Sequence, residues 1–282
     1  MIKNSTYWKY YNHAAIPVTP PNKAVNITEI QNGNIWKVDL GGKVLFARWT
    51  TDFDCNNVSN FWYVIKDEKF DVNFLKAKRR YEINKGLKNF NVEIIDAYKY
   101  KEELYEIQIA AYSGYPQKYR PKIEKNKFFK DITNSGNIII FGAFYKKTSQ
   151  CVGFAIVSCE SDDFVDFKVL RVNPEYEKYG INAALITKIL LYFNSFLDTG
   201  GIISDGTRNI NHETNFQDYL EKYFLFRKAY CKLHIVYNPQ IKWLINILYP
   251  FRKYLMKFDG ISLVHKINAV LKMEKLVRSQ NE

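Results

Sequence analysis

Residues 204–215 bring together side chains that could move a proton and bind an anion. Asp205 follows an apolar run and precedes Gly206, so burial could raise the pKa of its carboxyl and make it a base. His212 could also accept a proton near neutral pH, and Arg208 could bind a carboxylate or a phosphate through two parallel hydrogen bonds. Each side chain has a plainer interpretation, as a turn former, a polar loop residue or a surface ion-pair partner. A positioned side chain of this kind could take a proton from a reacting group.

The cysteines and histidines show no pattern of metal binding. Cys55, Cys151, Cys159 and Cys231 form no CxxC pair, and the four histidines lie far apart in the sequence. Structural zinc sites and disulfide scaffolds need closer or more regular spacing. We therefore expect no metal site and four reduced thiols, in or near the core.

The positive charge of the chain is concentrated in three segments. The 282 residues include 41 basic and 29 acidic side chains, which gives a net charge of +12. Segments 76–88, 118–130 and 240–282 each have a net charge of +5, and the rest of the chain has −3. Such segments favour anionic partners, namely a phosphate, a nucleic acid or a membrane surface. Ordinary solvated helix faces are the alternative.

Composition and the first residues exclude several classes of protein. With 47% hydrophobic and 16% aromatic residues, the chain can bury a large core, which excludes disorder throughout. No apolar run reaches the roughly 18–20 residues of a membrane-spanning helix. The first residues are polar and aromatic, unlike the apolar centre of a signal peptide. We therefore expect a cytoplasmic protein.

The spacing of apolar residues predicts the elements that would position these side chains. Alternation at 35–40, Gly41-Gly42 and a second apolar run at 44–47 predict a hairpin. From residue 96 the predicted order is helix, helix, three strands, helix, strand, helix and strand. These elements cover 102–112, 123–132, 137–145, 151–159, 164–172, 175–196, 202–204, 214–224 and 229–237. Hairpin-linked strands followed by a helical crossover predict a mixed sheet, antiparallel first and parallel at the crossover.

This order resembles the acetyltransferase fold of the GNAT superfamily over residues 96–240. Its most specific stretch is 172–185, VNPEYEKYGINAAL, in which Gly180 matches the first glycine of a strand-to-helix motif. Backbone amides at that helix start bind the pyrophosphate of coenzyme A. The resemblance implies cofactor contacts at Lys178, Tyr179, Gly180, Ile181, Asn182 and Ala183. Glu177 stands where the motif has Arg or Gln, and a carboxylate there would repel a pyrophosphate.

A second resemblance, to the Fem aminoacyltransferases, covers more of the chain. Residues 75–86, LKAKRRYEINKG, are similar to the basic segment before the second GNAT-like domain of these enzymes, and 204–215 is similar to FemAB-type sequence. Fem enzymes move an amino acid from aminoacyl-tRNA onto a peptidoglycan precursor and need no coenzyme A. The resemblance implies substrate binding by Thr207 and Arg208, and a phosphate or tRNA contact by Arg79, Arg80 and Lys85.

The GNAT resemblance also implies where the substrates meet. In such folds they meet where central parallel strands separate, which are here the ends of 164–172 and 202–204. An attacking amine could lose its proton there to Asp205 or Asp166, or to His212. The donor would be acyl-CoA or aminoacyl-tRNA, with no tightly bound cofactor, and the acceptor would be an amine.

We therefore expect an α/β fold (mixed α+β) with a GNAT-like, mostly antiparallel sheet flanked by helices. Residues 1–95 would form a β-rich extension or partial first GNAT-like domain, 96–240 the acyltransferase domain and 241–282 a helical tail. The predicted function is transfer of an acyl or aminoacyl group to an amine of a cell-wall or surface-glycan precursor. Alternatives are an acyl-CoA-dependent N-acetyltransferase and a non-catalytic protein that binds anionic polymers or membranes. Thermal shift with coenzyme A, acyl-CoA and aminoacyl-tRNA would distinguish them.

The C-terminal residues predict two basic amphipathic helices. Apolar residues recur near helical spacing over 240–257, where Pro250 would kink the helix, and again over 261–276. Such helices could bind the anionic inner face of a membrane peripherally. They could instead pack on the catalytic domain, or on a second copy of the chain in a homodimer.

Overall fold

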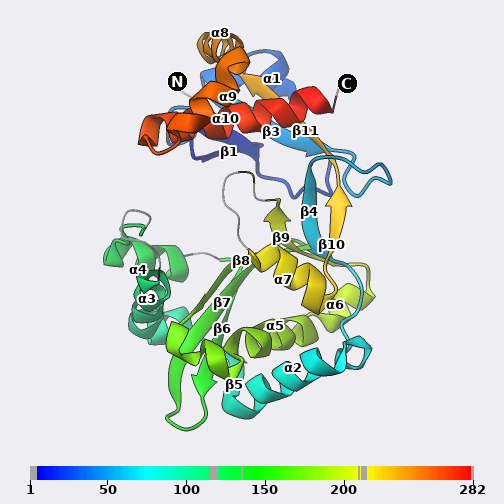
Figure 1. Ribbon diagram of the computed structural model, residues 1–282, viewed down its shortest axis with the longest axis vertical. Coiled ribbons are helices and arrows are strands. Elements are labelled where there is room, and N and C mark those ends of the chain that lie inside the picture. The colour runs from blue at the N-terminus through cyan, green and yellow to red at the C-terminus, as the bar shows by residue number, and fades with distance from the viewer. Residues whose placement is uncertain (1–4, 115–119, 135, 209, 211–214, 281–282) are drawn as a thin grey trace. The chain divides into compact units, whose positions relative to one another are not determined.

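The computed structural model describes residues 5–114, 120–134, 136–208, 210 and 215–280. They belong to two units, each assembled from separate stretches of chain. The central unit takes Ile65–Gly206 and Asp218–Arg227, and the terminal unit takes Met1–Val64, Thr207–Gln217 and Lys228–Glu282. The chain therefore passes from one unit to the other four times, as the colours in Figure 1 show.

The central unit is built on a mixed sheet. Its strands β5 (Phe90–Ile94), β6 (Ile138–Tyr145), β7 (Gln150–Ser161) and β8 (Phe164–Val172) pair antiparallel in chain order. Strand β9 (Ile202–Thr207) pairs with β8 in parallel, after a helical crossover. The whole sheet also includes β4 (Trp62–Lys66) and β10 (Arg227–Tyr230), the strands within which the chain crosses between the two units, and its strand order is β10-β4-β9-β8-β7-β6-β5. The predicted mixed sheet, antiparallel first and parallel at the crossover, is confirmed.

One face of this sheet is covered by α3 (Ala97–Ser113) and α4 (Lys125–Thr133), seen beside β6–β8 in Figure 1. Leu104 and Ile107 of α3 and Ile132 of α4 are buried in one cluster with Phe154 and Ile156 of β7. These residues recur every three or four positions in the helices and every second position in the strand, as each element requires to present one face. The core of this layer is therefore readable from periodicity.

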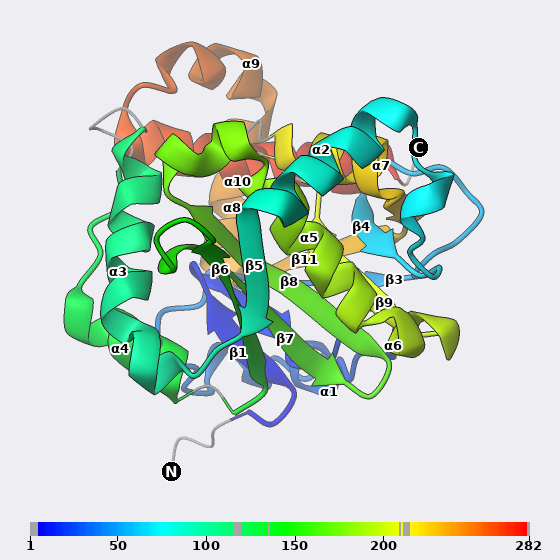
Figure 2. The ribbon, with the colours of Figure 1, turned by 90° about the horizontal axis from the view of Figure 1, so that it is seen from below.

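The other face is covered by α5 (Ile181–Tyr192), which is buried around most of its circumference. A Cβ on Gly153 of β7 would lie 2.8 Å from Cδ1 of Ile181, so this glycine lets the helix approach the sheet. Helix α2 (Ala77–Asn89) packs on α5, and Figure 2 shows the two helices side by side. A helix apolar on all sides needs such a second layer to cover it.

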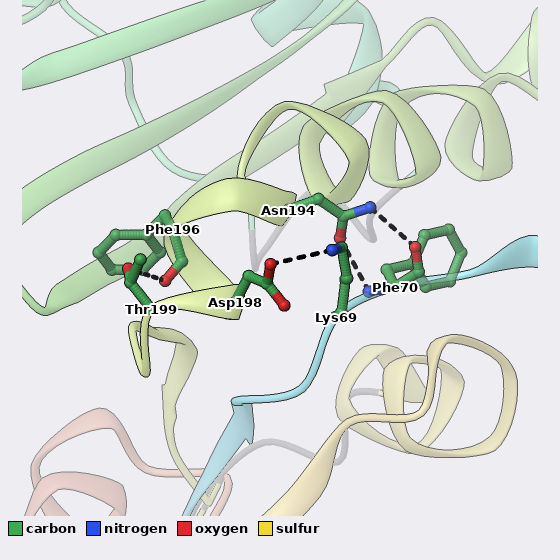
Figure 3. Close-up of polar contacts among 6 residues, drawn as sticks. All are labelled: Lys69, Phe70, Asn194, Phe196, Asp198 and Thr199. Carbon is green, nitrogen blue, oxygen red and sulfur yellow. Dashed lines mark hydrogen bonds and ion pairs between the residues drawn. The ribbon is translucent and has the colours of Figure 1, made fainter.

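The side chain of Asn194 forms two hydrogen bonds with the backbone of Phe70, in the segment between β4 and α2. Asn194 begins α6 (Asn194–Asp198); its Oδ1 accepts the backbone N–H of Phe70 at 2.8 Å and its Nδ2 donates to the Phe70 carbonyl at 2.9 Å (Figure 3). Beside this pair, Lys69 Nζ lies 3.0 Å from Asp198 Oδ2. One amide thus satisfies both backbone groups, as a neighbouring strand would. The Phe70 ring is buried, 6.1 Å from the ring of Phe224 in α7 (Asn215–Phe224).

The terminal unit has a sheet of four strands. These are β1 (Trp8–Tyr11), β2 (Ala14–Pro17), β3 (Phe46–Thr51) and β11 (Lys232–Tyr237), in the order β1-β2-β3-β11. Strand β3 runs parallel to β2 and antiparallel to β11. The sheet therefore joins the beginning of the chain to a strand near its end.

C-terminal helices complete the core of the terminal unit. They are α8 (Pro239–Leu248), the short α9 (Arg252–Leu255) and α10 (Ser262–Ser279); a single turn, α1 (Thr28–Gln31), precedes β3. Ile245, Leu271 and Met273 are buried in a cluster with Phe46 and Tyr237. Both predicted C-terminal helices form, and each has one face in this core. None of the helices in the described residues is long and apolar enough to cross a membrane.

Three predicted elements differ from the structure. The hairpin at 35–47 is wrong: Asn34–Trp36 forms a 3₁₀-helix after left-handed Gly33, and the alternating Trp36, Val38 and Leu40 pack against the cluster of Ile35 without forming a strand. The helix at 175–196 is divided, because Gly180 has a φ of +86°. The final strand at 229–237 is interrupted at Cys231, so β10 and β11 belong to different sheets. The boundaries at residues 95 and 240 stay a prediction.

Candidate functional site

The parallel strands β8 and β9 stay together for only a short distance. Phe164 pairs with Ile202, Val165 with Ile203 and Asp166 with Ser204, and within the described residues the pairing ends there. Strand β8 continues to Val172. Strands that separate in this way leave backbone groups between them that are available to a ligand. This is the place where the sequence predicts that substrates meet.

Two bulges on the β7–β8 hairpin place charged side chains beside this point. Lys168 is the extra residue of one register shift and Glu160 the extra residue of the other. Their side chains form an ion pair of 2.7 Å, and Lys168 Nζ also lies 3.6 Å from Asp166 Oδ2. Burial acts to lower the pKa of Lys168, but the hydrogen bond to Glu160 and the charges of both carboxylates together raise it. Lys168 is thus a protonated partner of Asp166.

Strand alternation separates the two predicted carboxylate bases. Asp166 is the register partner of both Ser158 and Ser204, so these three lie on one face of the sheet. Asp205, the next residue after Ser204, lies on the opposite face and is half-buried. The structure therefore does not bring Asp166 and Asp205 together on one face.

A glycine shapes the backbone directly after Asp205. Gly206 has a φ of +81°, a conformation that glycine adopts without strain. Its N–H donates to the hydroxyl of the buried Ser204 at 2.9 Å. The turn around Asp205 is therefore fixed locally, and the predicted interpretation of the Asp-Gly pair as a turn is consistent with this geometry.

Thr207 and Arg208 belong to the terminal unit, whereas Asp205 belongs to the central unit. The Thr207 carbonyl accepts a hydrogen bond of 3.0 Å from Gln217 Nε2. The backbone N–H of Arg208 donates to Trp62 O at 2.9 Å, and its Nη1 donates to Asn60 O at 2.8 Å. His212, the third predicted base, lies outside the described residues.

Arg208 lies against an aromatic ring together with a second cation. Its guanidinium carbon is 4.4 Å from the centre of the Trp62 ring, and Lys228 Nζ is 4.5 Å from the same centre. Tyr230 packs edge-on against Trp62 at 6.1 Å. The indole stabilises both cations, and their combined charge would attract an anion. The sequence indicated Arg208 alone; Lys228 stands 20 residues away and no spacing connects it to Trp62.

Two of the three predicted anion-binding cations in segment 76–88, Arg79 and Arg80, contact other groups of the protein. Arg79 is buried, with Nη1 2.7 Å from Glu82 Oε2 and its guanidinium carbon 3.6 Å from the centre of the Tyr223 ring. Arg80 Nη1 donates to the carbonyl of Leu75 at 2.6 Å. Lys85 is exposed. These contacts give Arg79 and Arg80 a structural role, and their contact with tRNA or phosphate stays a prediction.

The predicted pyrophosphate motif, residues 178–183, lies at a close contact between α2 and α5. A Cβ on Gly86 of α2 would lie 2.4 Å from the Gly180 carbonyl oxygen, and a Cβ on Gly180 would lie 3.1 Å from the backbone N and Cα of Gly86. Ile181 has no exposed surface, and Ala183 is buried as well. The start of α5 is therefore packed closely against α2 on the side of the Gly180 carbonyl.

The side chains around this helix start include a carboxylate and an unpaired amide oxygen, among the described residues, as well as a lysine. Glu177 is exposed three residues before Gly180, and Lys178 Nζ lies 5.2 Å from the centre of the Tyr179 ring. Asn182 Oδ1 is buried without a hydrogen-bond partner among the described residues. The cofactor role of residues 178–183 stays a prediction.

A pocket of about 360 Å³ in the described part of the terminal unit contains none of the predicted site residues. Cys55, Cys231 and Lys232 are among the residues that line it. No cluster of metal-ligating side chains occurs in the residues that the structure describes.

Comparison with solved structures identifies the architecture. FemX superposes with a TM-score of 0.57 at 9% identity, covering 84% of this chain and 85% of that one. L-PGS from Bacillus licheniformis gives 0.50 at 9% identity, with 86% and 83% covered. A GNAT-family acetyltransferase from Staphylococcus aureus Mu50 gives 0.31 at 19% identity, with 38% and 68% covered. No protein-family model matches this sequence, and no curated protein sequence matches it. The predicted GNAT-like fold is confirmed.

Proposed function

We propose that this protein is an acyltransferase that moves an aminoacyl group from aminoacyl-tRNA to an amine of a cell-wall or surface-glycan precursor. The observation that carries the proposal is the likeness to FemX, which extends over 84% of the chain and so includes residues of both units. The Fem-like sequence at 75–86 and 204–215 supports the same reaction class. The donor and the acceptor follow from that resemblance and are the parts to be tested.

The start of α5 supports an aminoacyl-tRNA donor over acyl-CoA. Gly86 contacts Gly180 so closely that a methyl group would not fit, and Glu177 adds a negative charge beside this contact. A pyrophosphate would meet a covered helix end and a carboxylate. An aminoacyl ester has no pyrophosphate, so it needs no such cradle.

The proposed reaction forms one amide bond and breaks one ester bond. The acceptor amine attacks the ester carbonyl and loses a proton, and the ribose oxygen of the tRNA leaves and takes up a proton. Asp205 is the proposed base, because it is half-buried at the end of β9. Arg208, with Trp62 and Lys228, is proposed to hold a phosphate of a substrate.

A transfer assay tests the reaction and its donor. The full chain is mixed with labelled aminoacyl-tRNA or labelled acyl-CoA and with amine-bearing precursors, and amide formation is measured. Transfer from aminoacyl-tRNA alone is expected. Transfer from acyl-CoA alone would refute the donor, and binding of anionic polymers without transfer from either donor would favour a non-catalytic protein.

Substitution of Asp205 tests the base. Asp205→Asn should lower turnover at least about tenfold, because a positioned base contributes roughly 10²–10⁴-fold. Asp162→Asn, at an exposed position in the turn between β7 and β8, is the matched control. A folded Asp205→Asn protein with unchanged turnover would remove Asp205 from the mechanism.

A further inference from the structure

The helical run from residue 239 to residue 258 leaves large apolar side chains in solvent. It consists of α8, a 3₁₀ turn (Tyr249–Phe251), α9 and a second 3₁₀ turn (Met256–Phe258) that follow without a gap. Five of its large apolar residues recur at intervals of 4, 4, 3 and 4 positions, close to helical spacing. They are 69, 43, 60, 60 and 43% exposed. We define the apolar row as Trp243, Ile247, Phe251, Tyr254 and Phe258.

The opposite face of the same run is already used by the fold. Ile245 is buried, and Ile241, Leu248 and Leu255 pack against the cluster that contains Phe46 and Tyr237. Packing within the terminal unit therefore explains one apolar face of the run and leaves the other unexplained. Scattered single apolar residues on a surface need no explanation, but a continuous row indicates a contact with something else.

Two more exposed residues extend this surface beyond the run. Ile261 is 56% exposed, and Leu263 in the first turn of α10 is 67% exposed. The surface thus has aliphatic as well as aromatic side chains.

The charges of the run are all of one sign. Residues 239–258 include Lys242, Arg252, Lys253 and Lys257 and no Asp or Glu. The three lysines are exposed, whereas the guanidinium carbon of Arg252 lies 4.2 Å from the centre of the Tyr249 ring. The first carboxylate after the run, Asp259, accepts hydrogen bonds from Asn268 and His265. The exposed lysines therefore stand among the apolar side chains without a nearby free carboxylate on the run itself.

We propose that the apolar row docks the terminal unit onto the surface of an anionic lipid bilayer. Trp and Tyr favour the level of the lipid headgroups, aliphatic side chains enter the acyl region, and lysines attract anionic lipids. A second copy of the chain would bring the same lysines against one another. A nucleic acid would offer no place for Ile247, Ile261 and Leu263. The proposal is independent of the transferase reaction.

Vesicle sedimentation tests the proposal on the full chain. Vesicles of phosphatidylcholine with about 30% phosphatidylglycerol are compared with vesicles of phosphatidylcholine alone. The protein should bind the anionic vesicles, bind the neutral ones far more weakly, and dissociate as salt is raised. Truncation before α8 is not a suitable test, because Ile245, Leu271 and Met273 belong to the core.

Paired substitutions separate the apolar and the charged contributions. Trp243→Ser with Phe251→Ser should weaken binding at least tenfold, whereas Phe74→Ser, at a side chain that is 80% exposed elsewhere, should not. Lys253→Glu with Lys257→Glu should weaken it at least about 25-fold, from about fivefold for each lysine removed. Lys99→Glu with Lys147→Glu, two exposed lysines of the central unit, is the matched control.

Three results would overturn the proposal. The first is a full-length protein that ignores anionic vesicles at low salt. The second is binding that both pairs of substitutions leave unchanged. The third is a dimeric wild type, in sedimentation velocity, that becomes monomeric on Trp243→Ser with Phe251→Ser, which would assign the apolar row to contact between two copies.

Discussion

The contact between Gly86 and Gly180 makes a prediction that opposes helix propensity. Gly86 lies inside α2, where replacing glycine by alanine normally stabilises a helix by about 0.5–1 kcal/mol. In this structure the added Cβ would stand 2.4 Å from the Gly180 carbonyl oxygen, and 3.1 and 3.2 Å from Cβ and N of Ala184. All three atoms belong to α5 or its first turn, and none can rotate away. The helices must therefore move apart.

The expected size of the effect follows from the two opposing terms. Overpacking of a close contact costs about 1–3 kcal/mol, and the distance of 2.4 Å places Gly86→Ala toward the upper end. After subtracting the gain in propensity, we expect a net loss of about 1–2 kcal/mol. For units of this size that is a fall in Tm of roughly 2–8 °C.

Thermal unfolding followed by circular dichroism measures this difference. Gly114→Ala is the matched control, because Gly114 ends α3 with a negative φ and a Cβ there would meet no atom within 4 Å. The control should leave Tm unchanged or raise it slightly. A Gly86→Ala protein with an equal or higher Tm than the wild type would refute the argument that α2 closes the start of α5.

Three further predictions concern buried or half-buried titratable groups. Lys66 is 1% exposed, and burial lowers its pKa while the carboxylates of Glu68 and Asp67 act against this. The wild type therefore loses stability as pH falls through the unfolded pKa of about 10.4. Lys66→Met should raise the free energy of unfolding by about 1–3 kcal/mol at pH 7 and change it little above about pH 10.5. Urea unfolding measures this difference, and a variant less stable than the wild type at pH 7 would contradict the prediction. Burial, and then the charge of Lys232, lowers the pKa of His234, so the wild type should lose stability as pH falls below about 6.5 and His234→Phe should lose less over the same range. Burial raises the pKa of Cys231 to about 12. Iodoacetamide at about pH 8 should therefore label this thiol at least about 100-fold more slowly in folded than in urea-unfolded protein. Equal labelling rates would show that the thiol is accessible in the folded protein.

The parts of the fold whose elements follow one another closely along the chain were predictable from the sequence. The strands β6, β7 and β8 are joined by short turns, and α5 and β9 follow them, so periodicity and turn residues were enough to order them. The packing residues of α3 and α4 followed from the same periodicity. The prediction of a hairpin at 35–47 failed because Trp36, Val38 and Leu40 pack against a core from a 3₁₀ turn and the irregular segment after it, which gives the same alternation as a strand.

Much of the candidate site could not be predicted, because its residues meet only after folding. Lys168 and Glu160 are paired by two register shifts, and no sequence pattern reports a bulge of this kind. Lys228 reaches Trp62 from a strand far along the chain. Conversely, the basic cluster at 76–88 predicts an anion site, but its Arg79 is buried and already in contact with Glu82 and Tyr223. Charge counts do not distinguish a solvated cation from one that is already paired.

The pairing of β3 with β11 has a consequence for synthesis on the ribosome. About 180 residues separate the end of β3 from the beginning of β11. At roughly 5–20 residues per second, the emerging β3 waits about 10–40 s for its partner. Until then one edge of β3 has unpaired backbone groups that could template the wrong association. Strand β3 thus reaches one of its two neighbours long after it is translated, and conditions that slow translation lengthen the interval in which a nascent chain can aggregate.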